Sequence, residues 1–176
     1  MNNIDIANTH LSNYTDYIGT IGYNKKVYSE REYDFLAFNQ NDSVVSNLNV
    51  RKAIAYGINK DLLISNVLNN NKTITKGPLD YGSYLSTDKE LLSYDSEKAK
   101  KALEDDGYSI SKGKYYKDGK ALTITILVCQ DYADRVKVAE NIKSQLAQVG
   151  ITVNISSVNS QIYKNAIENK SYQVML

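Results

Sequence analysis

Two periodicities of hydrophobic and polar residues divide the chain into strand-like and helix-like stretches. The segment 33–39 has β-forming aromatic residues at alternating positions, which predicts a strand. Apolar residues then recur at helical spacing over 49–58 and again over 59–68, which predicts two successive helices. Asn49 and Asn59 are the expected N-caps, because an asparagine side chain accepts hydrogen bonds from the free N–H groups of a first helical turn.

A third helix is predicted after a long loop over 69–93, which contains the only proline of the chain. Asp95 is its expected N-cap, and Gly107 ends the pattern. Glu97 and Lys101 are spaced for an ion pair one turn apart. The buried stripe of this helix is predicted to comprise Ala99, Ala102 and Leu103.

Two glycines predict particular local features, a close contact at one position and a tight turn at the other. Gly57 lies within the first predicted helix, where glycine costs about 1 kcal/mol relative to alanine, so we expect another backbone to pack closely against it. Gly119, in the pair Asp118-Gly119, predicts a hairpin turn between strands at 114–116 and 121–128. The second of these strands is apolar or β-branched from residue 122 onward, so we expect it to be buried on both faces.

The last part of the chain alternates helix and strand. A helix over 131–150 is followed by a strand over 152–156, a helix over 161–168 and a strand over 172–176. Strands joined by helices in this order favour a sheet covered by the helices. The predicted fold class is α/β, a single mixed-sheet domain with helices on both faces. Residues 1–32 are polar and are predicted to be an irregular segment that leads into this domain.

Composition and charge narrow the classes of protein. Of 176 residues, 42% are hydrophobic and 23% are charged, as in an ordinary globular domain with one core. The net charge of +1 argues against a nucleic-acid surface and a polybasic membrane patch. No apolar run approaches the roughly 20 residues that span a bilayer, so no direct membrane insertion by this segment is expected. The start of the chain lacks the features of a signal peptide, which favours either a cytosolic chain or a piece of a longer secreted precursor.

The reactive residues do not converge on an enzyme-like site. His10 is the only histidine and lies in the irregular segment. Cys129 is the only cysteine, which excludes an internal disulfide and a multi-thiolate metal site, and it ends a buried strand as a small apolar side chain. Glu104, Asp105 and Asp106 are interpreted as a solvated helix end, since a calcium site needs further oxygen ligands at loop spacing. We therefore predict no catalytic residue, no metal and no cofactor.

The stretch best placed to bind a ligand comprises Cys129, Gln130, Asp131 and Tyr132. It joins the carboxyl end of a buried strand to the start of a helix, which is where ligands bind in open α/β sheets. Asp131 is alternatively a plain N-cap, and one residue can serve both purposes. The chain has 15 tyrosines, and the pair Tyr115-Tyr116 is expected to consist of half-buried residues that pack against their neighbours.

Four stretches match the motifs of one protein family. Residues 33–39 end on the Phe-Asn of a family strand, and 49–60, NVRKAIAYGINK, match a signature of the type V-R-x-A-I-x-Y-[AG]-I-[ND]-[KR]. Residues 94–108 resemble a Y-D-P-E-K-A-K helix followed by glycine, with Ser96 in place of the usual proline, and 118–151 match an A-E-x-I-x-x-x-L-x-x-x-G-I segment after a hairpin. On these motifs the chain resembles the C-terminal lobe of the family 5 bacterial extracellular solute-binding proteins, the dipeptide, oligopeptide and nickel binders of ABC transporters.

The resemblance implies one lobe of a two-lobe, periplasmic-binding-protein type II-like fold. Residues 33–176 would be an incomplete C-terminal lobe, with the N-terminal lobe missing from this chain. The implied function is that of a substrate-binding component and not an enzyme. It would capture oligopeptides or dipeptides outside the cytoplasm and deliver them to ABC permease subunits, either as a cell-surface lipoprotein or in a periplasm.

The resemblance also divides the motif residues into candidate ligand-binding residues and structural residues. Asn39, which closes the Phe-Asn strand, joins residues 129–132 as a candidate ligand-binding residue. Arg51 is expected to make a structural ion pair or a hydrogen bond to a carbonyl. The structural residues of the motifs are predicted to be Arg51, Tyr56, Asn59 and Asp95.

Other interpretations stay open. The solute could be a non-peptide such as a nickel chelate. In a different class, the chain could be a small cytosolic α/β enzyme, which needs a pocket with a perturbed titratable group. It could also be an interaction module or sensor that uses the lobe fold, since fold alone does not decide function.

Overall fold

The computed structural model describes residues 26, 32–68, 72–75, 77–79 and 92–176. Predictions on most of the segment 1–32, on His10 and on much of the loop 69–93 lie outside the described residues.

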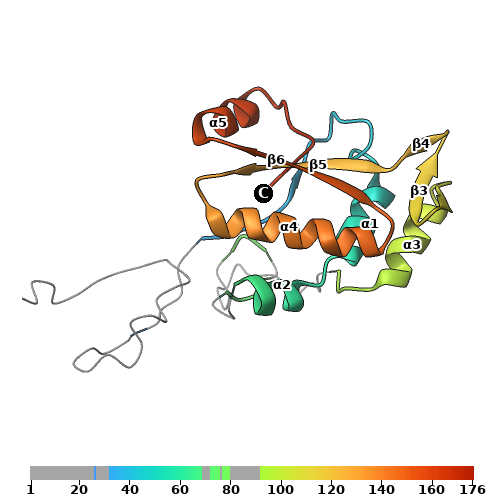
Figure 1. The fold of residues 1–176 in the computed structure, drawn as a ribbon, viewed down its shortest axis with the longest axis horizontal. Helices are drawn as coiled ribbons and strands as arrows, with labels where there is room; N and C mark the ends of the chain where they lie inside the picture. Colours follow the sequence, from blue (N-terminus) through green and yellow to red (C-terminus); the bar gives the residue numbers. More distant parts are fainter. Residues whose placement is uncertain (1–25, 27–31, 69–71, 76, 80–91) are drawn as a thin grey trace, which may run out of the picture.

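A four-stranded mixed sheet forms the centre of the fold (Figure 1). Its strands, in spatial order, are β1 (Ala37–Phe38), β7 (Val174–Met175), β5 (Thr123–Cys129) and β6 (Thr152–Val158). β5 pairs in parallel with β6 and β7, while β1 is antiparallel to β7. The helices α4 (Ala133–Gln148) and α5 (Ser160–Glu168) connect the parallel strands and lie on opposite faces of the sheet, which confirms the predicted α/β arrangement.

Two strands are shorter than the sequence pattern predicts. The alternation over 33–39 gives sheet pairing only at Ala37–Phe38, and the pattern over 172–176 gives pairing only at Val174–Met175. Two further backbone hydrogen bonds continue these contacts, from the N–H of Asn39 to the carbonyl of Gln173 (2.9 Å) and from the N–H of Leu176 to the carbonyl of Leu127 (3.0 Å). Alternation reports an extended, half-buried backbone, whereas a strand also needs a partner within hydrogen-bond reach.

A second, three-stranded antiparallel sheet stands beside the central one. It consists of β2 (Ser109–Ser111), β3 (Lys114–Lys117) and β4 (Lys120–Ala121), and β2 was not predicted. The predicted hairpin turn is present, with φ of 51° at Asp118 and 74° at Gly119. The single strand predicted over 121–128 is wrong, because the chain changes sheets at Leu122. Its N–H donates to the carbonyl of Tyr115 (2.7 Å), and its carbonyl accepts from Thr152 (3.1 Å).

The described residues form three more helices: α1 (Leu48–Gly57), α2 (Lys60–Val67) and α3 (Ser96–Glu104). The predicted caps of α2 and α3 are confirmed, since Asn59 accepts from the N–H of Leu62 and Asp95 from that of Lys98. Asn49 as the cap of α1 is wrong. Asn47, whose backbone is extended as a cap requires, accepts from the N–H groups of Asn49 (2.8 Å) and Val50 (3.4 Å).

The ion pairs of α3 also differ from the prediction. Glu97 pairs with Lys100 (2.8 Å), and Lys101 pairs with Asp105 (3.2 Å), so the predicted Glu97–Lys101 pair is wrong. Spacings of three and four residues both bring side chains together on a helix, and the sequence alone does not choose between them.

The core lies between the central sheet and the helices α1, α3 and α4. Gly57 is the last residue of α1, and a Cβ atom there would lie 2.8 Å from Leu146 Cδ2 and 3.1 Å from Val149 Cγ2. The position is tightly packed, but the prediction that another backbone packs against Gly57 is wrong, because its close neighbours are the side chains of Leu146 and Val149. The central buried side chains, all at most 3% exposed, are Val50, Ala53, Ile54, Ala99, Leu103, Ile124, Ile126, Val128, Ala139, Ile142 and Leu146.

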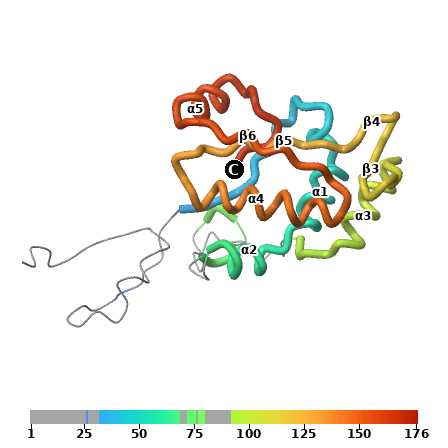
Figure 2. Tube along the Cα trace, in the orientation of Figure 1, coloured from blue at the N-terminus to red at the C-terminus, as the bar shows by residue number. Residues whose placement is uncertain are grey.

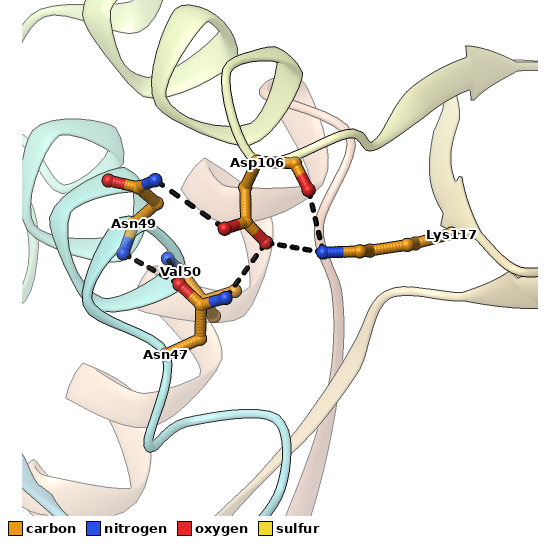
Figure 3. Close-up of polar contacts among 5 residues, drawn as sticks. All are labelled: Asn47, Asn49, Val50, Asp106 and Lys117. Carbon is orange, nitrogen blue, oxygen red and sulfur yellow. Dashed lines mark hydrogen bonds and ion pairs between the residues drawn. The ribbon is translucent and has the colours of Figure 1, made fainter.

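Asp106 connects three parts of the fold (Figure 3). Its Oδ2 atom accepts hydrogen bonds from Asn47 Nδ2 (2.8 Å) and Lys117 Nζ (2.9 Å), and its Oδ1 atom accepts from Asn49 Nδ2 (3.5 Å). Partial burial acts to raise the pKa of this carboxyl, but the hydrogen bonds from Asn47 and Lys117 outweigh it and lower the pKa. The interpretation of this acidic stretch as a solvated helix end is therefore wrong for Asp106, which links the start of α1 to β3.

Glu104 also has a partner. It accepts a hydrogen bond from the hydroxyl of Tyr115 (3.0 Å), whose side chain is only 1% exposed. The prediction that Tyr115 is half-buried is wrong, because this residue belongs to the buried core and its ring packs against Gly150. Burial, followed by the contact with Glu104, raises the pKa of Tyr115 to about 12.

Candidate functional site

The carboxyl ends of the parallel strands lie at one edge of the central sheet, which we call the carboxyl edge. β5 ends at Cys129 and β6 at Val158, and α4 and α5 begin shortly after them. The N–H of Gln130 donates to the carbonyl of Val158 (2.8 Å), so the chain leaves the two strands side by side. Figure 2 shows the ends of β5 and β6, the first turn of α4 and the segment leading into β1 together at the left of the view.

The predicted contact loop, residues 129–132, is located at this edge. The thiol of Cys129 is free and buried, at 1% exposed, whereas the next three residues are exposed. Asp131 as the N-cap of the following helix is wrong. Tyr132 occupies the N-cap position of α4, and no side chain of the described residues caps this helix.

A cluster that was not predicted joins this loop to the segment before β1. Arg135 Nε donates to Asp34 Oδ1 (2.9 Å), and the guanidinium carbon lies 4.5 Å from the centre of the Tyr132 ring. The side chains of Arg135 and Asp34 are 29% and 37% exposed. A sequence signal existed, because Arg135 is a cation in the first turn of a helix, where the helix dipole disfavours positive charge. No sequence signal identified its partner Asp34, which lies 101 residues away.

Tyr163 of α5 faces the same region. Its hydroxyl donates to the backbone carbonyl of Leu176 (2.8 Å), at the end of β7. Burial raises the pKa of Tyr163, while the positive charge of Arg135 acts in the opposite direction. The first turn of α4, the helix α5 and the end of β7 therefore meet at the carboxyl edge.

Exposed aromatic rings flank this cluster. The rings of Tyr33 and Phe35 stack at 5.5 Å and remain 37% and 49% exposed, and Tyr132 is 54% exposed. Successive side chains of an extended chain point to opposite sides, so the Tyr33–Phe35 stack lies on the opposite side of its segment from Asp34. Such rings provide apolar area to a ligand or to a neighbouring domain.

Asn39 does not lie with the contact loop. Because β1 is antiparallel to β7, Asn39 follows β1 at the opposite end of β7 from the carboxyl edge. Its side-chain Nδ2 donates to the carbonyls of Lys170 (2.9 Å) and Tyr172 (2.7 Å), and its Oδ1 accepts from the N–H of Asn41 (3.1 Å). These contacts hold the end of β1 against the segment that leads into β7.

The other motif residues make structural contacts. The expected hydrogen bond of Arg51 to a carbonyl is present, since its Nη1 donates to Val45 O (2.9 Å) and to Ser46 O. The carbonyl of Tyr56 accepts from the N–H of Asp95 (2.9 Å), which joins α1 to the cap of α3. Asn59 caps α2 and donates its own N–H to Gln145 of α4.

Two further properties concern the described residues alone. Within them, no group of three or more His, Cys, Asp or Glu side chains is arranged to hold a metal ion. None of the helices found there has the length and apolar character that a membrane crossing needs.

Comparison with known proteins links this fold to one family. The family described as bacterial extracellular solute-binding proteins, family 5 Middle, matches residues 2–176. The glutathione-binding protein GsiB of Pectobacterium atrosepticum is 27% identical over 136 residues, which cover 77% of this chain and 24% of that protein. The nickel-binding periplasmic protein of Escherichia coli is 29% identical over 145 residues, 80% of this chain and 28% of that protein. The oligopeptide-binding protein AppA of Bacillus subtilis is 25% identical over 126 residues, 69% of this chain and 23% of that protein.

Solved structures agree on the fold. NikA from Brucella suis, in complex with Fe(III)-EDTA, superposes with a TM-score of 0.74 at 24% identity, over 80% of this chain and 29% of that one. AppA from Bacillus subtilis, in complex with a nonapeptide, superposes with a TM-score of 0.69 at 22% identity. The match covers 80% of this chain and 29% of that one. The predicted periplasmic-binding-protein type II-like fold class is confirmed, and the chain spans about a quarter of the length of the curated relatives it matches.

Proposed function

Because this chain belongs to the bacterial extracellular solute-binding proteins of family 5, we propose that it is one lobe of the substrate-binding component of an ABC importer. In this proposal residues 33–176 form an incomplete C-terminal lobe, and the N-terminal lobe lies outside this chain. The protein works outside the cytoplasm, anchored by lipid or free in a periplasm, and delivers its solute to permease subunits. The family match over residues 2–176 is the observation that carries the proposal.

The carboxyl edge is the part of the lobe that fits a solute. Backbone ends, exposed aromatic rings and a partly exposed guanidinium meet there. A solute clamped between two lobes loses water on both sides, which strengthens each polar contact that it makes. We therefore propose no catalytic role for this edge, since binding and release are all that an importer requires of it.

Peptides are the proposed solute. Of the curated relatives above, one is named for glutathione, which is a tripeptide, and one for oligopeptides. The exposed ring of Tyr132 suits an apolar side chain, and Gln130 and Asp131 offer polar contacts to a peptide backbone. Cys129 contributes backbone atoms only, because its side chain is 1% exposed. We assign Asn39 a structural role, because both ends of its amide are bound to backbone.

A nickel chelate is the second candidate solute. It is favoured by the nickel-binding periplasmic protein of Escherichia coli, which is 29% identical to this chain. A chelate brings most of its own metal ligands, so it needs polar and aromatic contacts from the lobe in place of a cluster of metal-binding side chains.

Thermal unfolding of the full-length protein that contains this chain tests both candidates. A panel of di- to pentapeptides is compared with nickel in the presence and absence of L-histidine. A solute at 100 times its Kd stabilises the folded state by about 2.7 kcal/mol, which gives a measurable rise in Tm. A rise with nickel and histidine alone would replace the peptide assignment, and no rise with either class would refute the binding function.

A further inference from the structure

We propose that Arg135 anchors a carboxylate group of the solute, which for a peptide is the C-terminal carboxylate. This inference rests on the proposed function, because it assigns a ligand group to one residue of the carboxyl edge. It assigns Asp34 and Tyr132 as positioning residues that hold the guanidinium in place.

Within the part of the chain that the structure describes, the hydrogen bonding of Arg135 leaves most of its donors available. A guanidinium carries five N–H groups in a rigid plane, and the bond to Asp34 uses the single one on Nε. Among the residues that the structure describes, the two Nη atoms, with four N–H groups, have no hydrogen-bond acceptor. At 29% exposure the side chain is already partly desolvated, yet it can still be reached from solvent. A carboxylate, which accepts two parallel hydrogen bonds, fits these remaining donors.

The surroundings of Arg135 also fix its geometry and its electrostatic preference. The guanidinium carbon lies over the Tyr132 ring, 4.5 Å from its centre, and Nε is held by Asp34, so little side-chain entropy remains to be lost on binding. Arg135 belongs to the first turn of the 16-residue helix α4, whose dipole favours a negative group at this end. Both the helix end and the guanidinium therefore favour an anion, and Asp34 satisfies this preference only in part.

Binding of one peptide in two forms tests the assignment. The full-length protein is titrated calorimetrically with Ala-Phe-Ala as the free acid and with the same peptide as its C-terminal amide. In the unchanged protein the acid is expected to bind about tenfold to a hundredfold more tightly, the range that corresponds to one charge-assisted contact. Arg135→Gln is expected to remove this preference, and Arg135→Lys to keep part of it, because lysine retains the charge but loses the paired geometry.

A matched control lies two residues further along α4. Lys137 is also a cation and pairs with Asp134 at 3.3 Å, so Lys137→Gln changes the net charge equally and is expected to leave the acid-to-amide ratio unchanged. If Lys137→Gln and Arg135→Gln lower the ratio equally, long-range charge explains the effect and the inference is overturned. If acid and amide bind the unchanged protein equally, the inference fails while the proposed function stands. Binding of neither form refutes both.

Asp34→Asn separates an anchor from a plain structural ion pair. The asparagine oxygen can still accept from Arg135 Nε, but the competing negative charge is gone. An anchoring role predicts that Asp34→Asn tightens binding of the acid by severalfold and leaves the amide unaffected. A purely structural pair predicts that Asp34→Asn and Arg135→Gln weaken both peptides alike, which would contradict the inference.

Discussion

Replacement of Asp106 by asparagine tests how the region between the start of α1 and β3 is held together. The carboxylate accepts from Asn47 at 2.8 Å and from Lys117 at 2.9 Å, and its side chain is 16% exposed. Asparagine has nearly the same shape, so the variant removes the charge without opening a cavity. Its NH2 group replaces one acceptor oxygen by a donor that faces other donors.

The expected loss follows from the exposure of each contact. A hydrogen bond to a charged group contributes about 1.5–3 kcal/mol, and the partly buried bond from Asn47 is of this kind. Lys117 is 39% exposed, so water screens its ion pair, which adds less than the bond from Asn47. We expect Asp106→Asn to lower the free energy of unfolding by about 2 kcal/mol. For a chain of this size that corresponds to a fall in Tm of about 4–8 °C, which far-UV circular dichroism can follow.

The pH dependence has a defined sign. The hydrogen bonds hold the pKa of Asp106 in the folded state below its ordinary value of 3.8. Its stabilisation is therefore complete well above pH 3.8 and is lost progressively as the pH falls through 3.8 to the folded-state pKa. The difference in unfolding free energy between the unchanged chain and Asp106→Asn should be constant from neutral pH down to about pH 5 and should shrink below that.

Asp105→Asn is the matched control. Asp105 is the preceding residue, but it is 58% exposed and pairs with Lys101 on the surface of α3 at 3.2 Å. Such a pair contributes about 0.5 kcal/mol or less. The reasoning would be refuted if both variants lowered the free energy of unfolding equally. It would also be refuted if the loss caused by Asp106→Asn stayed the same in acid.

Two further predictions concern packing and alkaline pH. Gly57→Ala places a Cβ atom 2.8 Å from Leu146 Cδ2, so we expect it to lower the free energy of unfolding by about 1–3 kcal/mol. Gly77→Ala is the control, because a Cβ there meets nothing within 4 Å, and it should change the free energy of unfolding by less than about 0.5 kcal/mol. Urea unfolding measures both, and equal midpoints would show that α4 moves aside without cost. Tyr115→Phe removes the hydrogen bond to Glu104 and should lower stability by about 1 kcal/mol at neutral pH. Because the pKa of Tyr115 is raised from 10.0 to about 12, its stabilisation is present below pH 10 and lost as the pH rises toward 12, so a deficit that grows with alkaline pH would contradict this account.

The sequence by itself determined the features that neighbouring residues control. Asn59 and Asp95 cap their helices, and Asp118-Gly119 forms the hairpin turn. These outcomes depend on backbone preferences and on hydrogen bonds spanning two or three residues, which the local sequence contains in full. The α/β class followed for the same reason, because the order of strands and helices is a property of the chain.

The tertiary structure decided which of these pieces meet. Hydrophobic periodicity shows that a side chain is buried, but it does not name the neighbour that buries it. The change of sheet at Leu122 depends on a hydrogen bond to Thr152, and the separation of Asn39 from the contact loop depends on β1 being antiparallel to β7. The contact of Arg135 with Asp34 spans 101 residues. Contacts of this range form only when the whole core assembles, because packing of the sheet and helices, and no local preference, brings the two segments together.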